Sequence, residues 1–153
     1  MFKDSLFAIE CKIYFEYHQC MSKKLLIVED DASLFNLYKT ELELKGYDVV
    51  HVADGTNAAQ TIAETNPDLV LLDLMLPGKN GLQILEEVKA NPATKALKVI
   101  MLTNFGNDDN VSRALELGAE DYIMKYNIVP SELSDKVASL LGDAENSAVK
   151  FVQ

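Results

Sequence analysis

The segment LVLLDLMLPGKNG, residues 69–81, is the most informative part of the sequence for the fold. It begins as an apolar run, which is typical of a strand that helices cover on both faces of a parallel sheet. It ends in a turn containing proline, glycine and asparagine. Asp73 lies where the strand gives way to the turn, and a carboxylate buried there needs a cation or hydrogen-bond donors. Open α/β sheets bind their ligands at these carboxyl ends of the strands.

Similar apolar runs recur along the chain and alternate with segments of helical periodicity. Strands are predicted at 25–28, 48–52, 69–74, 98–102 and 121–124. Helices are predicted around Leu34, Leu37, Tyr38 and Leu42, around Ala58, Ala59, Ile62 and Ala63, around Leu82, Leu85 and Val88, around Val111, Ala114 and Leu115, and around Leu133, Val137, Leu140 and Leu141. Ser131 is the predicted N-cap of the last helix. Five such strand–helix units predict an α/β fold with a parallel sheet between two layers of helices.

Composition narrows the class of protein. The chain has 153 residues, 48% of them apolar and 25% charged, which suits a soluble globular domain. A net charge of −10 argues against a nucleic-acid-binding face, and no run approaches the ~18 apolar residues of a membrane span. Cys11 and Cys20 match no metal spacing, and no secretory signal is recognisable, so we expect a cytoplasmic protein without a membrane anchor.

Charged residues follow two further strands. Glu29, Asp30 and Asp31 follow the first strand, and Lys125 follows the fifth. Together with Asp73 they predict a small site for Mg²⁺ and a phosphoryl group, since Mg²⁺ prefers oxygen ligands and phosphoryl transfer requires charge neutralisation. The acidic residues also have a local explanation. Acids favour helix N-termini, and aspartate favours turns.

Four segments resemble the signature segments of the receiver domain of two-component response regulators. They are IVEDD at 27–31, LLDLMLPGKNG at 71–81, MLTN at 101–104 and GAEDYIMK at 118–125. The resemblance implies the flavodoxin-like receiver fold, a five-stranded parallel sheet in the order 2-1-3-4-5. That order comes with the resemblance, because the chemotaxis receiver is itself a standard example of it.

The resemblance also implies a metal site. Asp73 would be the phosphoacceptor, and Glu29 and Asp30 would be the acidic pair that holds Mg²⁺. Asp30 would bind the ion directly and Glu29 through water. Asp73 and the backbone carbonyl of Met75 would complete the protein ligands.

Further roles follow for the phosphorylated state. Thr103 and Lys125 would contact the phosphoryl group, and Thr103 and Tyr122 would relay phosphorylation to the face formed by the fourth helix, fifth strand and fifth helix. Taken alone, a tyrosine such as Tyr122 is most often part of the core packing.

The implied function is that of a stand-alone response regulator receiver that accepts a phosphoryl group from the phosphohistidine of a sensor histidine kinase and signals by contact with a downstream protein. It is not predicted to be an enzyme beyond its own phosphorylation and dephosphorylation. Two alternatives are a phosphorelay intermediate that passes the group to a histidine phosphotransfer domain, and a scaffold that is never phosphorylated. A dehalogenase-type phosphatase would need an acid where Met75 stands, and a flavodoxin-like cofactor binder would need a phosphate loop where acids 29–31 stand.

Four positions depart from the usual receiver pattern. Tyr126 replaces the proline that commonly follows the lysine, so we predict a trans peptide there and a differently shaped loop. Asn104 is larger than the usual residue. Met75 and Phe105, each two residues beyond a site residue, are apolar and offer no group to orient a hydrolytic water.

We divide the chain into an N-terminal extension at 1–22, the receiver domain at 23–142 and a C-terminal tail at 143–153. Residues 7–17 alternate apolar and polar side chains with the period of a strand, although a helix also fits. Their apolar face is predicted to pack on the receiver or on a second chain. A homodimer would form through this arm or through the face formed by the fourth helix, fifth strand and fifth helix.

Overall fold

The computed structural model describes residues 22–104 and 106–143, and it contains one parallel sheet of five strands. The strands are β1 (Lys24–Val28), β2 (Asp48–Val52), β3 (Leu69–Leu72), β4 (Lys98–Thr103) and β5 (Asp121–Met124). Their order across the sheet is β2-β1-β3-β4-β5. The predicted α/β class and strand order are confirmed.

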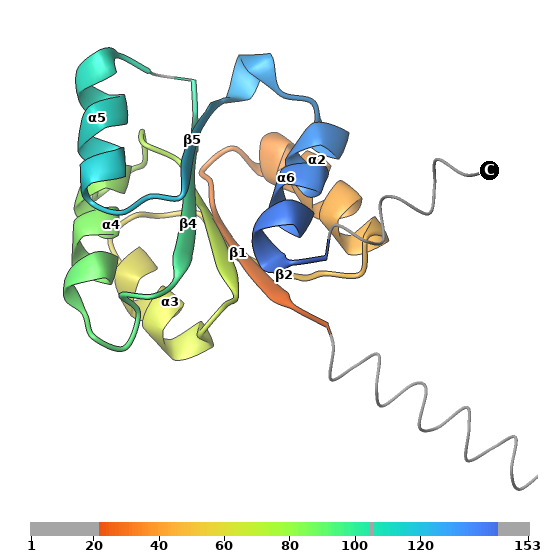
Figure 1. The fold of residues 1–153 in the computed structure, drawn as a ribbon, viewed down its shortest axis with the longest axis horizontal. Helices are drawn as coiled ribbons and strands as arrows, with labels where there is room; N and C mark the ends of the chain where they lie inside the picture. The colour runs from red at the N-terminus through yellow and green to blue at the C-terminus, as the bar shows by residue number, and fades with distance from the viewer. Residues whose placement is uncertain (1–21, 105, 144–153) are drawn as a thin grey trace, which may run out of the picture.

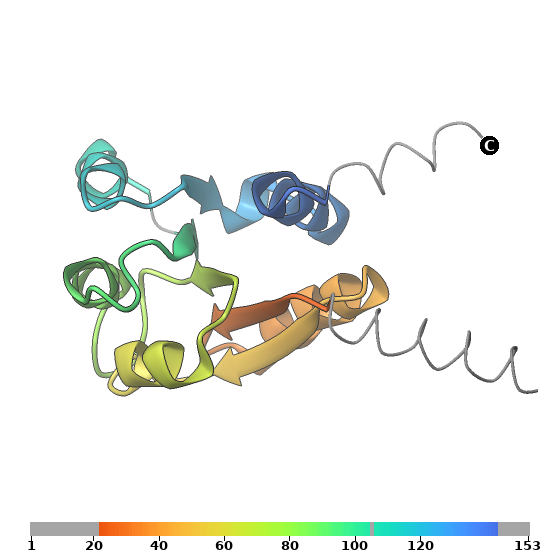
Figure 2. The same cartoon turned by 60° about the horizontal axis from the view of Figure 1, so that its bottom comes forward.

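Helices cover both faces of this sheet. They are α2 (Ala32–Leu44), α3 (Ala58–Thr65), α4 (Gly81–Ala90), α5 (Asp108–Glu116) and α6 (Pro130–Leu141), with a short 3₁₀ helix, η1 (Lys125–Asn127), after β5. Helices α2 and α6 lie on one face, and α3, α4 and α5 lie on the other (Figures 1 and 2). The core therefore has two layers. Leu25 and Ile27 of β1 pack on the side of α2 and α6, whereas Leu26 and Val28 pack on the opposite side.

Several predicted boundaries shift in the structure. Strand β3 ends at Leu72, two residues earlier than predicted, and β4 continues to Thr103. Helix α6 begins at Pro130 with Val129 as its N-cap, so the prediction of Ser131 as N-cap was wrong. Proline suits the first helical position because its φ is already fixed. The Glu132 carboxylate then accepts a hydrogen bond from the Val129 N–H at 3.2 Å.

The buried face of α2 also differs in one residue from the expected set. Phe35, Tyr38 and Leu42 are buried, whereas Leu37 is 51% exposed. Spacings of three and four residues place the first three on one face of a helix, and Leu37 falls outside that face. The helix itself was predicted correctly.

The two ends of the chain lie mostly outside the described residues. Neither the predicted packing of residues 7–17 nor the proposed homodimer is tested, and the domain boundaries remain predictions. Asp143 is the last residue described, and its carboxylate lies 2.9 Å from the ammonium of Lys23. Within residues 22–104 and 106–143, no helix is both long enough and apolar enough to cross a membrane.

Candidate metal and phosphoacceptor site

Three carboxylates converge at the carboxyl edge of the sheet. Glu29 and Asp30 follow β1, and Asp73 follows the neighbouring strand β3. One oxygen from each of the three lies within 4.8 Å of the others. Glu29 is 2% exposed and Asp73 is 6% exposed, whereas Asp30 is exposed to solvent. The predicted acidic cluster is therefore assembled with two buried members and one accessible member.

Lys125 pairs with both buried carboxylates. Its Nζ lies 2.5 Å from Glu29 Oε2 and 2.7 Å from Asp73 Oδ2. Burial alone would lower the pKa of Lys125, but the hydrogen bonds that Lys125 donates to Asp73 and Glu29, together with the negative charges of these carboxylates, raise it overall. Burial has the larger effect on Glu29 and raises its pKa in spite of the hydrogen bond from Lys125. One cation thus pairs with two buried carboxylates, and the exposed carboxylate of Asp30 adds further negative charge.

The backbone around Asp73 is fixed by its neighbours. Its N–H donates to the carbonyl of Val28 at 3.1 Å, and its Oδ1 accepts a hydrogen bond from the N–H of Met75 at 3.3 Å. Helix α4 begins close by at Gly81, where a Cβ atom would collide with the backbone oxygen of Asp73. Glycine therefore allows α4 to start directly against the strand end that carries the carboxylate.

Asp31 has a separate, structural role. Its Oδ1 accepts hydrogen bonds from the N–H groups of Ser33 and Leu34 at 2.9 and 3.1 Å, which caps α2. Its own N–H donates to Glu29 Oε1 at 3.1 Å. The local explanation of the acidic run thus holds for Asp31, which leaves Glu29 and Asp30 for the site.

Thr103 and Tyr122 lie on the two strands at the other side of Asp73. Thr103 is fully buried at the end of β4 and is paired in the sheet with Met124 of β5. Tyr122 is half-buried against the core layer of α3, α4 and α5, and burial, followed by the charge of Asp73, raises its pKa. The phenol is therefore neutral near pH 7.

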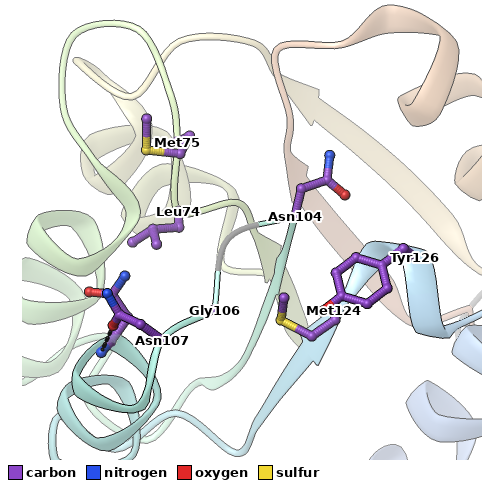
Figure 3. A pocket seen from close by; sticks show the side chains of 8 residues that line it. Leu74, Met75, Asn104, Gly106, Asn107, Met124 and Tyr126 are labelled. Atoms are coloured by element: carbon purple, nitrogen blue, oxygen red, sulfur yellow. Dashed lines mark hydrogen bonds between the residues drawn. The ribbon is translucent and has the colours of Figure 1, made fainter.

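An open cavity of about 440 Å³ lies beside the site. Its lining comes from the segments that follow β3 and β4 and from the end of β5 with η1, and comprises Leu74, Met75, Asn104, Gly106, Asn107, Asn110, Met124 and Tyr126. Leu74 and Met75 lie on one side of it, and Asn104, Met124 and Tyr126 on the other (Figure 3). Three of the positions that depart from the receiver pattern, Met75, Asn104 and Tyr126, thus line one cavity.

The peptide bond before Tyr126 is trans, as predicted, since the described residues contain no cis peptide bond. Tyr126 itself lies within η1.

The donor set fits Mg²⁺. The ion takes oxygen ligands in octahedral geometry and keeps several waters, so one or two carboxylates with open access are sufficient. The exposed Asp30 provides that access, and Asp73 lies next to it.

The structure also shows a contact beside the site that local sequence signals did not predict. In this contact, Nε2 of His51 on β2 lies 2.8 Å from the backbone oxygen of Glu29.

Comparison with known proteins shows the family to which the chain belongs. Residues 25–138 match the family model of the response regulator receiver domain. The DNA-binding response regulator MtrA of Mycolicibacterium paratuberculosis is 40% identical over 121 residues, which cover 79% of this chain and 52% of MtrA. The phosphate regulon transcriptional regulatory protein PhoB of Escherichia coli is 36% identical, over 86% of this chain and 57% of PhoB. The chain thus spans about half the length of these curated relatives.

A solved structure shows the same fold. The CheY-like response regulator receiver domain protein of Methanospirillum hungatei superposes with a TM-score of 0.72 at 32% identity, over 82% of this chain and 98% of that chain. The chain belongs to the response regulator receiver family of two-component signalling.

Proposed function

We propose that Asp73 accepts a phosphoryl group, in a Mg²⁺-dependent reaction, from the phosphohistidine of a sensor histidine kinase or a histidine phosphotransfer protein. The observation that supports this most directly is the Asp73 carboxylate at a strand end, with Lys125 at 2.7 Å and two further acids nearby. Membership of the receiver family supports the same chemistry. The reaction takes place in the cytoplasm.

In the transfer, a carboxylate oxygen of Asp73 forms a bond to phosphorus as the bond between phosphorus and the imidazole nitrogen breaks. Mg²⁺, held by Asp30, Asp73 and the Met75 carbonyl and through water by Glu29, would supply neutralisation of the phosphoryl charge. Lys125 already lies against Asp73 and is positioned to pair with a phosphoryl oxygen. The Thr103 hydroxyl would donate to another.

The output of the receiver is a contact with another protein. Thr103 and Tyr122 would carry the change to the surface of α5, β5 and α6, and a chain with net charge −10 favours a protein partner over nucleic acid for that surface. The relatives MtrA and PhoB are a DNA-binding regulator and a transcriptional regulator, so the receiver contact can equally control a DNA-binding partner.

A role as a phosphorelay intermediate is favoured by one observation. Met75 is 56% exposed beside Asp73 and offers no polar group to orient a hydrolytic water. A slowly hydrolysed phosphoaspartate would persist long enough to pass its phosphoryl group to a histidine phosphotransfer domain.

The assignment is tested by incubation with acetyl phosphate and Mg²⁺, followed by intact mass spectrometry. We expect one added phosphoryl group, no addition after chelation of Mg²⁺, and none in Asp73→Asn. Asp143→Asn is the matched control, because Asp143 also pairs with a lysine but lies at the opposite edge of the sheet. Labelling of Asp73→Asn to the wild-type level would contradict the assignment. A wild-type chain that takes no label would favour the unphosphorylated scaffold.

A further inference from the structure

His51 contacts the turn that carries the acidic pair. Its Nε2 lies 2.8 Å from the backbone oxygen of Glu29, a residue 22 positions earlier in the chain. A carbonyl oxygen can only accept, so Nε2 carries a hydrogen and donates it. A nitrogen that donates in this way has no free lone pair for a metal. Nε2 of His51 is therefore not available as a metal ligand, although it lies next to the site.

A second contact fixes the orientation of the His51 ring. The ring stacks on Phe35 of α2, with ring centroids 3.7 Å apart and an interplanar angle of 7°. Phe35 is itself only 7% exposed, so it is a fixed support for the imidazole. The turn between β1 and α2 is thus held at both ends. The imidazole donates a hydrogen bond to Glu29, the first residue of the turn, and packs on Phe35 of α2, the helix that follows the turn.

Residues of β2 form hydrogen bonds with both backbone groups of Glu29. The N–H of Glu29 donates to the carbonyl of Val52 at 3.0 Å, and the Glu29 carbonyl accepts from His51. The Glu29 carbonyl and the N–H of Asp30 belong to one planar peptide unit. A hydrogen bond that fixes this carbonyl therefore also fixes the orientation of the peptide plane that ends at the Cα atom of Asp30, which carries the side chain. The Asp30 carboxylate itself is exposed and depends on its backbone for orientation.

We propose that His51 is a positioning residue that aligns the Asp30 carboxylate for Mg²⁺ through the Glu29 carbonyl. The inference rests on the proposed role of Asp30 as a direct metal ligand. Loss of the hydrogen-bond donor should weaken metal binding by roughly threefold to tenfold, the range expected for one hydrogen bond of ordinary strength.

The test compares His51→Met with His51→Gln in the full chain. The two replacements have similar length, but only glutamine offers an N–H donor. Because His51 is an exposed strand residue, both variants should fold, which circular dichroism can verify. The dissociation constant is measured by titration with Mn²⁺ followed by electron paramagnetic resonance, with Mg²⁺ as competitor. We expect His51→Met to bind both ions threefold to tenfold more weakly and His51→Gln to stay within about twofold of wild type.

The Mg²⁺ concentration for half-maximal acetyl-phosphate labelling should rise in His51→Met by the same factor as the dissociation constant. A purely structural His51 would lower the urea midpoint and leave metal affinity unchanged, and that result would overturn the inference. Equal weakening in His51→Gln would also overturn it, because the donor would then not be the cause. Asp30→Asn in the same titration separates the two proposals. Wild-type Mn²⁺ affinity in that variant would refute the metal site itself, whereas weak binding there with full affinity in His51→Met would refute only the role of His51.

Discussion

Two lysine–carboxylate groups lie at opposite edges of the sheet, and they differ in burial. At the carboxyl edge, Lys125 pairs with Asp73 and Glu29, and all three side chains are between 3% and 7% exposed. At the amino edge, Lys23 pairs with Asp143, and these side chains are 31% and 30% exposed. A buried ion pair costs desolvation that its attraction only partly offsets, whereas an exposed pair costs and contributes little. A lysine–carboxylate pair therefore contributes differently to stability at the two edges, because one group is buried and the other is partly exposed.

The two groups also differ in their charge balance. At the amino edge, Lys23 donates to the Leu141 carbonyl at 2.6 Å and to Asp143 at 2.9 Å, and the Tyr47 hydroxyl donates to the other Asp143 oxygen at 3.0 Å. One cation meets one anion there. At the carboxyl edge, one lysine meets two buried carboxylates with a third acid beside them. The Lys23–Asp143 pair is balanced in charge, whereas the group at the carboxyl edge has an excess of negative charge that an added cation would neutralise.

The excess negative charge at the carboxyl edge predicts a complete loss of labelling when the accessible acid is removed. Asp30→Ala removes the accessible ligand, so the acetyl-phosphate label should fall below detection at millimolar Mg²⁺. Asp48→Ala removes an exposed acid at the amino edge and is the control, with labelling expected at the wild-type rate. If Asp30→Ala takes up label as fast as wild type, the charge excess has no part in metal binding.

The stabilities of two lysine variants test the difference in burial. Lys125→Met leaves two buried carboxylates without their cation and should lower the free energy of unfolding by about 3–5 kcal/mol. Lys23→Met removes an exposed partner and should lower it by about 1 kcal/mol or less. Urea titrations in the absence of divalent ions measure both values. Equal losses in the two variants would show that burial does not distinguish the two edges.

Much of this arrangement could be predicted from the sequence because its signals are local. Short segments rich in apolar residues mark the five strands, and the residues that follow three of them identify Glu29, Asp30, Asp73 and Lys125. What could not be predicted depends on contacts between distant segments. The simultaneous pairing of Lys125 with Glu29 and Asp73 joins residues that follow three different strands. The contact between His51 and Glu29 joins β2 to the residue that follows β1.

Local rules also competed with one another. Ser131 is a favourable N-cap by residue type, but the preference of Pro130 for the first helical position places the cap at Val129. The apolar positions predicted for this helix included Leu37, yet in α2 the buried side chain is that of Phe35 instead. Which apolar side chain of a helix is buried depends on its contacts in the folded chain. Phe35 stacks on His51, which is distant in the sequence.

A smaller effect concerns the lifetime of the phosphorylated state. Met75 provides no polar atom for water next to Asp73, so Met75→Asn should speed the loss of the label by about tenfold, below the ~10²–10⁴-fold of a dedicated general base. The measurement is the decay of labelled protein after removal of acetyl phosphate. Val129→Asn is the control, because Val129 has similar exposure, 53% against 56%, and lies outside the cavity lining. Rapid wild-type decay that Met75→Asn leaves unchanged would contradict the prediction.

The smallest effect belongs to the amino edge. Tyr47→Phe removes the hydrogen bond to Asp143 and should lower the free energy of unfolding by about 1 kcal/mol at pH 7. Labelling of Asp73 should be unaffected, since Tyr47 lies at the edge away from the site. Urea titration and acetyl-phosphate labelling of the same preparation measure the two quantities. A change in the labelling rate would show that the two edges of the sheet are coupled.

The pH dependence of that stability difference tests its cause. Burial, reinforced by the hydrogen bond to Asp143, raises the pKa of Tyr47 above its ordinary value near 10. The folded state therefore holds the phenol proton more tightly than the unfolded state does, and the resulting stabilisation is present below about pH 10 and is lost as the pH rises further. The advantage of wild type over Tyr47→Phe should consequently shrink above pH 10, while other titrating groups cancel in the comparison. Urea titrations of both proteins from pH 7 to pH 11 measure this difference, and an advantage that stays constant across the range would show that the Tyr47 hydroxyl is not the group responsible.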